Sequence, residues 1–209
     1  MALVIEIQLP GNALTRSQTS LALLVERAAA GDKAAFEQIM IHSQQRVMSM
    51  SWRILGNEAD ARDASQEVFL RLYKYLGRFK PEQDFFAWLY RINVNVCRDM
   101  LKQRQNQNNR FRSFATEPEE EILDVPDEQP DAEQSLINAQ RRELISRAIA
   151  TLPFKERASI VLRDVEGLST DEVAQILKSS STTVRSQISS ARRKIRDHCR
   201  QYLRGGQKS

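Results

Sequence analysis

The sequence is poor in cysteine, glycine and long apolar runs. Its 2 cysteines, Cys97 and Cys199, lie far apart and outside any CxxC pair, and His42 and His198 do not stand at metal-ligand spacing from them. We therefore expect no metal site and no disulfide framework, and a reduced, cytoplasmic compartment. No apolar run approaches the roughly 20 residues of a membrane-spanning helix. The apolar start lacks an early basic region, so we expect neither membrane insertion nor a signal peptide.

Catalytic signatures are also missing from the sequence. It has no glycine-rich phosphate loop and no nucleophile–base–acid set, so we expect no catalytic residues and no cofactor. With only 7 glycines and few alternating apolar–polar runs, almost every periodic segment has helical spacing. We therefore expect an all-α fold. The predicted helices cover about residues 20–30, 33–55, 58–76 and 84–105, and then about 133–152, 154–165, 170–177 and 181–203.

An acidic segment separates these two sets of helices. Nine acidic residues and no basic one lie between Glu117 and Glu133, together with Pro118, Pro126 and Pro130. Such a stretch buries little apolar surface and is typical of a flexible linker. The predicted organisation is an N-terminal extension (1–19), a helical domain (20–105), the linker (106–134), a second helical domain (135–204) and a tail (205–209).

The second domain ends in a candidate helix-turn-helix. Ser169 and Glu172 form a capping box at the start of a short helix, and a tight turn leads from it into a longer helix. The segment from Lys178 to Ser209 contains nine basic residues and a single acidic one, Asp197. A basic end beside an acidic middle indicates a polyanionic partner.

The longer helix has a polar, basic face opposite its apolar one. Small hydroxyl residues let a helix backbone sit deep in a major groove, and arginines reach phosphates or guanine edges. The alternative is an ordinary solvated face, but the capped helix, the tight turn and the unpaired basic charge together favour duplex DNA. The predicted contact residues are Thr182, Arg185, Ser186, Ser189, Arg192 and Arg193.

The helix over residues 84–105 has a different polar stripe. Cations that hold a backbone, beside an aromatic that stacks on bases, suit single-stranded nucleic acid. The alternative for Trp88 is a place in the core. The stripe consists of Trp88, Arg91, Asn95, Arg98 and Lys102, and the preceding loop adds Arg78, Phe79 and Lys80.

The helix over residues 58–76 carries an acidic ridge formed by Asp60, Asp63, Gln66 and Glu67. Because an acidic ridge repels DNA, this face more plausibly meets a basic protein surface. The alternative is again a solvated helix face.

Two strings resemble a known family. DASQEVFLRLYKYL (63–76) followed by FFAWLYRINVNVCRDML (85–101) resembles region 2 of the extracytoplasmic-function (ECF) group of sigma-70 factors. LPFKERASIVLRDVEGLSTDEVAQIL (152–177) with TTVRSQISSARRKI (182–195) resembles region 4 of the same group. The two matches occur in the family's order and cover most of the chain.

The resemblance implies a promoter-reading subunit of bacterial RNA polymerase. It implies that the helix with Asp63, Gln66, Glu67 and Phe69 docks on the beta-prime subunit, and that region 4 meets the beta-subunit flap. The loop at 78–84 and the helix after it would open and hold the single-stranded −10 element. The helix from Ser181 would read the −35 duplex. An inhibitory anti-sigma partner is typical of the group.

The sequence departs from the family pattern near the turn. The turn usually contains a glycine or small residue before serine, but here it contains Lys178. At two positions of the −35 helix where the family pattern has arginine, this sequence has Gln187 and Ser190. Both belong to the predicted −35 residues. Two rival functions remain open. One is a duplex-binding regulator that acts without polymerase, and the other is a hydrolase or transferase.

Overall fold

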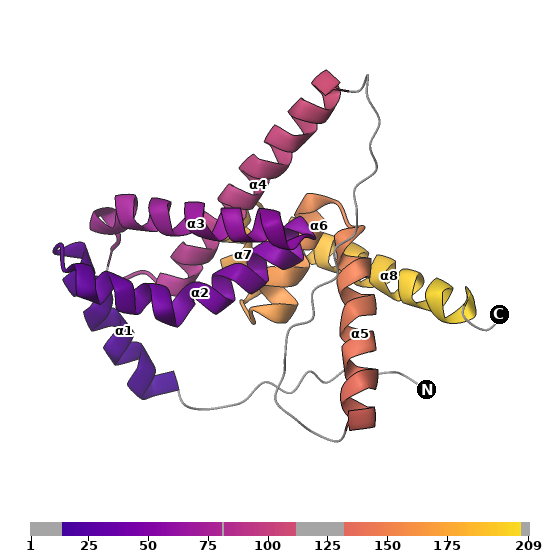
Figure 1. Cartoon of the computed structure of the whole chain (residues 1–209), viewed down its shortest axis with the longest axis horizontal. Helices are drawn as coiled ribbons and strands as arrows, with labels where there is room; N and C mark the ends of the chain where they lie inside the picture. Colours follow the sequence, from indigo (N-terminus) through magenta and orange to yellow (C-terminus); the bar gives the residue numbers. More distant parts are fainter. Residues whose placement is uncertain (1–13, 81, 112–131, 206–209) are drawn as a thin grey trace.

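The computed structural model describes residues 14–80, 82–111 and 132–205 (Figure 1). Every element in these ranges is helical, which confirms the all-α fold class. The remaining parts of the predicted extension, linker and tail lie outside the described residues. The elements are α1 (Leu14–Ala29), α2 (Lys33–Leu55), α3 (Glu58–Tyr75), the short helix η1 (Leu76–Arg78), α4 (Phe85–Phe111), α5 (Ala132–Ala150), α6 (Phe154–Ile160), η2 (Val161–Val165), α7 (Thr170–Leu177) and α8 (Ser181–Gly205).

Local capping signals explain the bounds of α2, which begins and ends where the sequence predicts. The Asp32 carboxylate accepts a hydrogen bond from the Ala35 amide at 3.1 Å, so it caps the first turn. This bond lowers the pKa of Asp32 below its usual value. Gly56 ends the helix with φ of 83°, a left-handed conformation that favours glycine.

Other bounds differ from the expectation. α1 begins at Leu14, and α4 continues to Phe111 through the Gln/Asn-rich stretch that we assigned to the linker. Glutamine is a good helix former, so polarity alone does not end a helix there. The predicted helix over 154–165 consists of α6 and a π-helical turn, η2.

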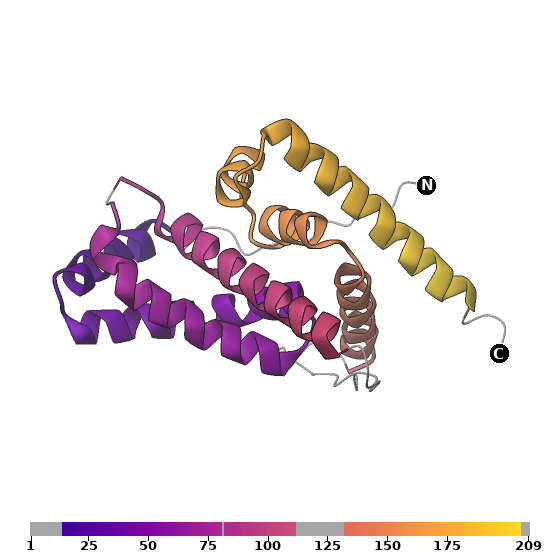
Figure 2. The same cartoon turned by 90° about the horizontal axis from the view of Figure 1, so that it is seen from above.

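The helices form two blocks, α1–α4 and α5–α8, which share one buried cluster. In the first block, α2 and α3 pack on each other and on α4. In the second, α5, α6 and α7 support α8, whose apolar face buries Val184, Ile188 and Ala191. Figure 2 shows the second block lying along the first. No helix within residues 14–80, 82–111 and 132–205 is long and apolar enough to cross a membrane.

Candidate nucleic-acid and protein interfaces

The polar stripe of α4 lies on a helix that is buried on its other sides. Leu89, Val96 and Cys97 face the core with no exposed surface. Burial raises the pKa of the Cys97 thiol to about 12, so this cysteine stays protonated and unreactive. The buried amide of Asn93 donates to the Val47 carbonyl at 3.1 Å, which ties α4 to α2.

Four residues of the stripe are half-buried, and the last one, Lys102, is exposed. The Arg98 guanidinium donates to the Asn95 amide oxygen at 2.6 Å. The Nε atoms of Arg91 and Arg98 are buried and have no hydrogen-bond partner among the described residues. The structure therefore brings the predicted residues of α4 together as a row of cations held close to the protein surface.

Trp88 belongs to an aromatic cluster at the start of α4. Its ring centroid lies 5.2 Å from that of Phe79 and 6.4 Å from that of Phe85. Phe85 is buried, whereas Phe79 and Trp88 are half-buried. The alternative that Trp88 packs on the core therefore holds in part, because its ring stabilises the loop while part of it remains accessible.

The loop before α4 places its two predicted cations on the surface. Arg78 and Lys80 are both exposed, and the Arg78 guanidinium lies 5.4 Å from the centroid of the Tyr75 ring. Asp84 caps α4 by accepting a hydrogen bond from the Ala87 amide at 2.7 Å. The cap fixes the point at which the loop joins the helix.

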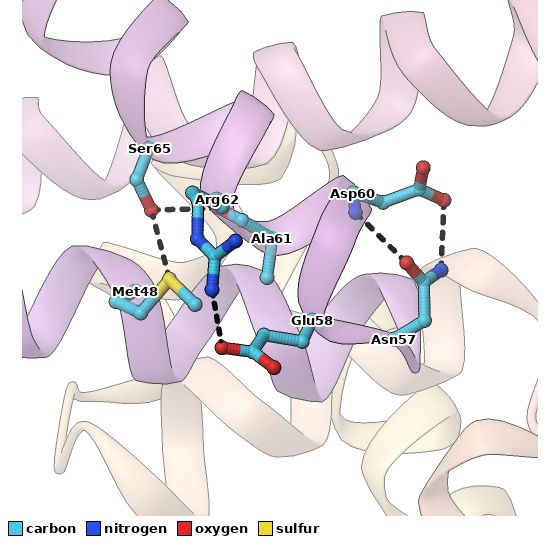
Figure 3. Close-up of polar contacts among 7 residues, drawn as sticks. All are labelled: Met48, Asn57, Glu58, Asp60, Ala61, Arg62 and Ser65. Carbon is cyan, nitrogen blue, oxygen red and sulfur yellow. Dashed lines mark hydrogen bonds and ion pairs between the residues drawn. The ribbon is translucent and has the colours of Figure 1, made fainter. Parts of the chain in front are cut away.

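A polar network fixes the start of the acidic ridge on α3 (Figure 3). Asn57 accepts a hydrogen bond from the Asp60 amide at 2.8 Å and donates one to the Asp60 carboxylate at 2.8 Å. Arg104 of α4 also donates to Asp60, at 2.9 Å. Asp60 therefore has a structural role at the helix start, besides its predicted place in the ridge.

The rest of the ridge divides into paired and unpaired groups. Glu67 accepts a hydrogen bond from Arg71 at 2.7 Å, and Arg71 also reaches Asp99 at 3.0 Å. Asp63 and Gln66 are exposed. No side-chain partner is recorded for Asp63 among the described residues, so its charge is the more available one.

Two exposed apolar residues on the same face of α3 were not predicted from the sequence. Leu70 is 67% exposed and Tyr73 is 58% exposed, whereas the predicted Phe69 is only 9% exposed. Asp63, Gln66, Leu70 and Tyr73 follow one another at steps of three, four and three, so they share one side of α3. This spacing was the available signal, but only the polar members of this face were included in the predicted ridge.

The second helix of the helix-turn-helix exposes the predicted DNA face. The capping box is confirmed, because Ser169 accepts from the Glu172 amide at 3.2 Å and Glu172 accepts from the Ser169 amide at 2.7 Å. Hydrogen bonding of the Glu172 carboxylate by the Ser169 side chain, and then by the Ser169 amide, lowers the pKa of Glu172. Most of the predicted −35 side chains on α8 are exposed: Thr182, Arg185, Ser186, Ser189, Arg192 and Arg193.

Gln187 and Ser190 have a different environment. Both are half-buried, and both contact α6. Gln187 accepts a hydrogen bond from Ser159 at 2.8 Å, and Ser190 donates to Glu156 at 3.2 Å. The two residues that depart from the family pattern thus bind the neighbouring helix, so the structure gives them a packing role.

A basic pocket lies where α8 passes η2 and the start of α7. Arg192 donates twice to Asp164, at 2.9 and 2.7 Å, and this pair raises the pKa of Arg192. The sequence did not single out Arg163 and Arg196, which extend the positive charge beyond the predicted set. The lining residues are Arg163, Thr170, Arg185, Ile188, Ser189, Arg192 and Arg196.

Comparisons with known proteins agree with this arrangement. The family model described as Sigma-70 region 2 matches residues 40–107, and the one described as Sigma-70, region 4 matches residues 142–195. The chain is 32% identical over 183 residues to the ECF RNA polymerase sigma-E factor of Escherichia coli strain K12, covering 87% of this chain and 95% of that protein.

Two further relatives have similar identity. The RNA polymerase sigma-H factor of Pseudomonas aeruginosa is 30% identical over 175 residues, covering 82% of this chain and 90% of that protein. The ECF sigma factor SigE of Mycolicibacterium smegmatis is 34% identical over 173 residues, covering 81% of this chain but 65% of that longer protein.

Solved structures share the fold at lower identity. The sigma factor RpoE of Bartonella quintana, solved with the anti-sigma factor NepR, superposes with a TM-score of 0.65 at 17% identity, covering 79% of this chain and 96% of that one. CnrH, solved with the cytosolic domain of CnrY, gives 0.58 at 24% identity, covering 85% and 96%. Together with the sequence relatives, this places the chain in the ECF group of the sigma-70 family, the non-enzymatic factors that direct RNA polymerase to promoters.

Proposed function

We propose that three surfaces divide the work of this sigma factor. The outer face of α3 docks on core polymerase, the stripe of α4 holds the melted −10 strand, and α8 reads the −35 duplex. The observation that carries the proposal is the face formed by Asp63, Gln66, Leu70 and Tyr73. A regulator that binds only duplex DNA has no use for such a face.

The composition of this face indicates its partner. Exposed carboxylate and amide groups beside two exposed large apolar side chains suit a surface that is both basic and apolar. Exposed apolar patches on otherwise charged helices mark protein-binding sites. The beta-prime subunit is the partner that the family resemblance implies, and region 4 would meet the beta-subunit flap.

The two DNA surfaces suit different forms of DNA. Half-buried arginines beside Trp88 hold a flexible single strand against the rigid helix α4. The exposed hydroxyl and arginine side chains of α8 can enter a major groove. The pocket adds Arg163 and Arg196 as phosphate contacts that position the helix on the duplex.

An anti-sigma partner and a cytoplasmic location are also part of the proposal. Both superposed structures were solved as complexes, RpoE with the anti-sigma factor NepR and CnrH with the cytosolic domain of CnrY. A partner protein that covers a docking face would inhibit this chain. Polymerase and promoter DNA are in the bacterial cytoplasm, and the two free cysteines suit that reduced compartment.

Reversing the charge of Asp63 tests the docking role most directly. We expect Asp63→Arg to weaken co-purification with core polymerase by at least about 100-fold, because a cation would face a basic partner surface (~3 kcal/mol). Glu67→Arg should have the same effect, but it also breaks the ion pair with Arg71. Asp63→Arg is therefore the cleaner variant.

The matched control is Glu37→Arg, which makes the same charge change at an exposed position of α2 that has no ion pair among the described residues. It should co-purify with core polymerase at the wild-type level. Circular dichroism should show an intact helical fold for both variants. Wild-type recovery of core polymerase with Asp63→Arg would overturn the docking role. Run-off transcription with purified core polymerase separates the proposal from a regulator, because only a sigma factor produces promoter-specific transcripts.

A further inference from the structure

One acidic residue stands among the cations of α4. Between Phe85 and Phe111 the helix contains five basic residues, and Asp99 is its only acidic one. Aspartate is a weak helix former in a helix interior, and a negative charge repels the phosphates of a nucleic acid. The carboxylate of Asp99 is therefore unfavourable both for this helix and for the DNA strand that the helix is proposed to hold.

Asp99 borders the polar stripe of α4. It follows Asn95 by four positions and precedes Lys102 by three, and residues at these spacings are neighbours on a helix surface, with Cβ atoms about 5–6 Å apart. The Asp99 side chain is 50% exposed. A DNA phosphate bound between Asn95 and Lys102 would therefore lie within the roughly 8 Å over which charges interact at physiological ionic strength. An unpaired Asp99 would repel that phosphate.

An arginine of the neighbouring helix compensates this charge. Arg71 of α3 donates from Nη1 to the Asp99 carboxylate at 3.0 Å and from Nε to the Glu67 carboxylate at 2.7 Å. A guanidinium carries several N–H donors in one fixed plane, so a single arginine can serve two carboxylates at once. No other ion pair of Asp99 is recorded among the described residues. Arg71 is therefore shared by the acidic ridge of α3 and the stripe of α4.

The ion pair between Arg71 and Asp99 is too exposed to contribute much to the stability of the fold. The side chain of Arg71 is 32% exposed, and ion pairs at the protein surface stabilise proteins only slightly. Buried apolar side chains, among them Val68 and Leu72 of α3 and Val96 of α4, belong to the core that joins the two helices. The main physical consequence of the pair is therefore its effect on the charge beside the stripe.

We propose that Arg71 is a positioning residue for the −10 strand, because its pairing with Asp99 cancels the negative charge at the edge of the stripe and directs that carboxylate toward α3. Arg71 acts on DNA binding through Asp99, without touching the strand. The role rests on the proposed function of the stripe, and it adds two residues that were not among the predicted ones. A merely structural ion pair would act instead by holding α3 against α4.

Three variants separate these two roles: Arg71→Ala, Asp99→Asn and the double variant. Holoenzyme is assembled at saturating core polymerase, and fluorescence anisotropy measures its affinity for a single-stranded oligonucleotide with the −10 sequence of a promoter that gives a run-off transcript. Arg71→Ala leaves the charge of Asp99 unpaired, so we expect the affinity to fall at least about 5-fold. Asp99→Asn removes that charge, so its affinity should equal or exceed that of the wild type. The double variant should return to within about 2-fold of the wild-type affinity, since neither charge of the pair remains.

The matched control is Arg62→Ala, which removes an exposed arginine from the same helix. It breaks an ion pair with Glu58 at 2.6 Å that lies within α3 (Figure 3), so its affinity for the strand should stay at the wild-type level. Because Arg71 also pairs with Glu67 of the ridge, a titration with core polymerase verifies that Arg71→Ala still docks. The deficit of Arg71→Ala in strand binding should shrink as the salt concentration rises, because salt screens exposed charges.

The double variant decides between the two roles. If it binds the strand as weakly as Arg71→Ala does, the ion pair acts by holding the helices together, and the proposal is overturned. Wild-type affinity of Arg71→Ala for the strand would also overturn it. A failure of the proposed function gives a different result, in which the wild-type holoenzyme binds the −10 oligonucleotide no better than one of scrambled sequence. Arg71 would then have no strand to position.

Discussion

The two helices proposed to read promoter DNA differ in how much of their surface the protein covers. α4 lies between α2 and α3 on one side and α7 on another, and most positions from Leu89 to Cys97 are buried. α8 buries only one face, formed by Val184, Ile188 and Ala191. A single strand needs a rigid platform, whereas a major groove must enclose much of a helix. The degree of burial thus follows the form of DNA that each helix is proposed to meet.

The comparison predicts that two asparagines of α4, two positions apart and so on different sides of the helix, have opposite roles. Asn93→Ala should cost about 3 kcal/mol, because it leaves a cavity and strands the buried Ser51 hydroxyl, which donates to Asn93 at 2.9 Å. Asn95→Ala lies in the stripe and should cost less than about 1 kcal/mol. It should instead weaken binding of a −10 single-stranded oligonucleotide to the holoenzyme. Urea unfolding gives the first quantity, and fluorescence anisotropy gives the second. Equal losses of stability in Asn93→Ala and Asn95→Ala would contradict the description of α4 as a rigid helix with one buried side and one DNA-binding side.

On α8, a variant in the exposed face should leave the fold unchanged and weaken DNA binding. Arg185→Ala should change the free energy of unfolding by less than about 0.5 kcal/mol, since its side chain is exposed. It should weaken holoenzyme binding to a −35 duplex about 10- to 30-fold, by roughly 2 kcal/mol. Glu37→Ala, a change at an exposed position of α2, is the control. The proposed contact between Arg185 and the −35 element is wrong if the Arg185→Ala holoenzyme binds both wild-type and −35 mutant promoters with the same affinities as the unaltered holoenzyme.

Local sequence signals predicted the helices well, whereas contacts between distant segments could not be predicted. The capping residues Asp32 and Ser169 and the terminal Gly56 act within a few residues, so the sequence displays them directly. Tyr90 and Glu166 meet only because the two blocks pack together, and no local pattern records that packing. Similarly, the family resemblance put Gln187 among the −35 residues, but the sequence could not show that α6 lies close enough to bind it.

α8 packs on α5, α6 and α7, and α7 leads directly into it, so its position depends on the caps and turns around α7. Ser169→Ala should cost about 1 kcal/mol by removing the side-chain cap. The folded pKa of Glu172 is lowered, so its share of this stabilisation is present above the unfolded pKa, about 4.3, and is lost as the pH falls through the folded value. The stability difference between wild type and Ser169→Ala should therefore be full at pH 7 and shrink below about pH 4. A difference that grows on acidification would contradict the capping account.

The smallest effect concerns the turn between α7 and α8, where the sequence departs from the family pattern. Lys178 adopts φ of 51°, a left-handed conformation in which most side chains are strained and glycine is not. Lys178→Gly should therefore raise the free energy of unfolding by about 0.5 kcal/mol, the relief of strain exceeding the added flexibility of the unfolded chain. Lys178→Ala removes the same charge but keeps the Cβ atom, so it should give no such gain. If both variants stabilise the protein equally in urea unfolding, the gain comes from the lost charge. The turn would then hold α8 without backbone strain.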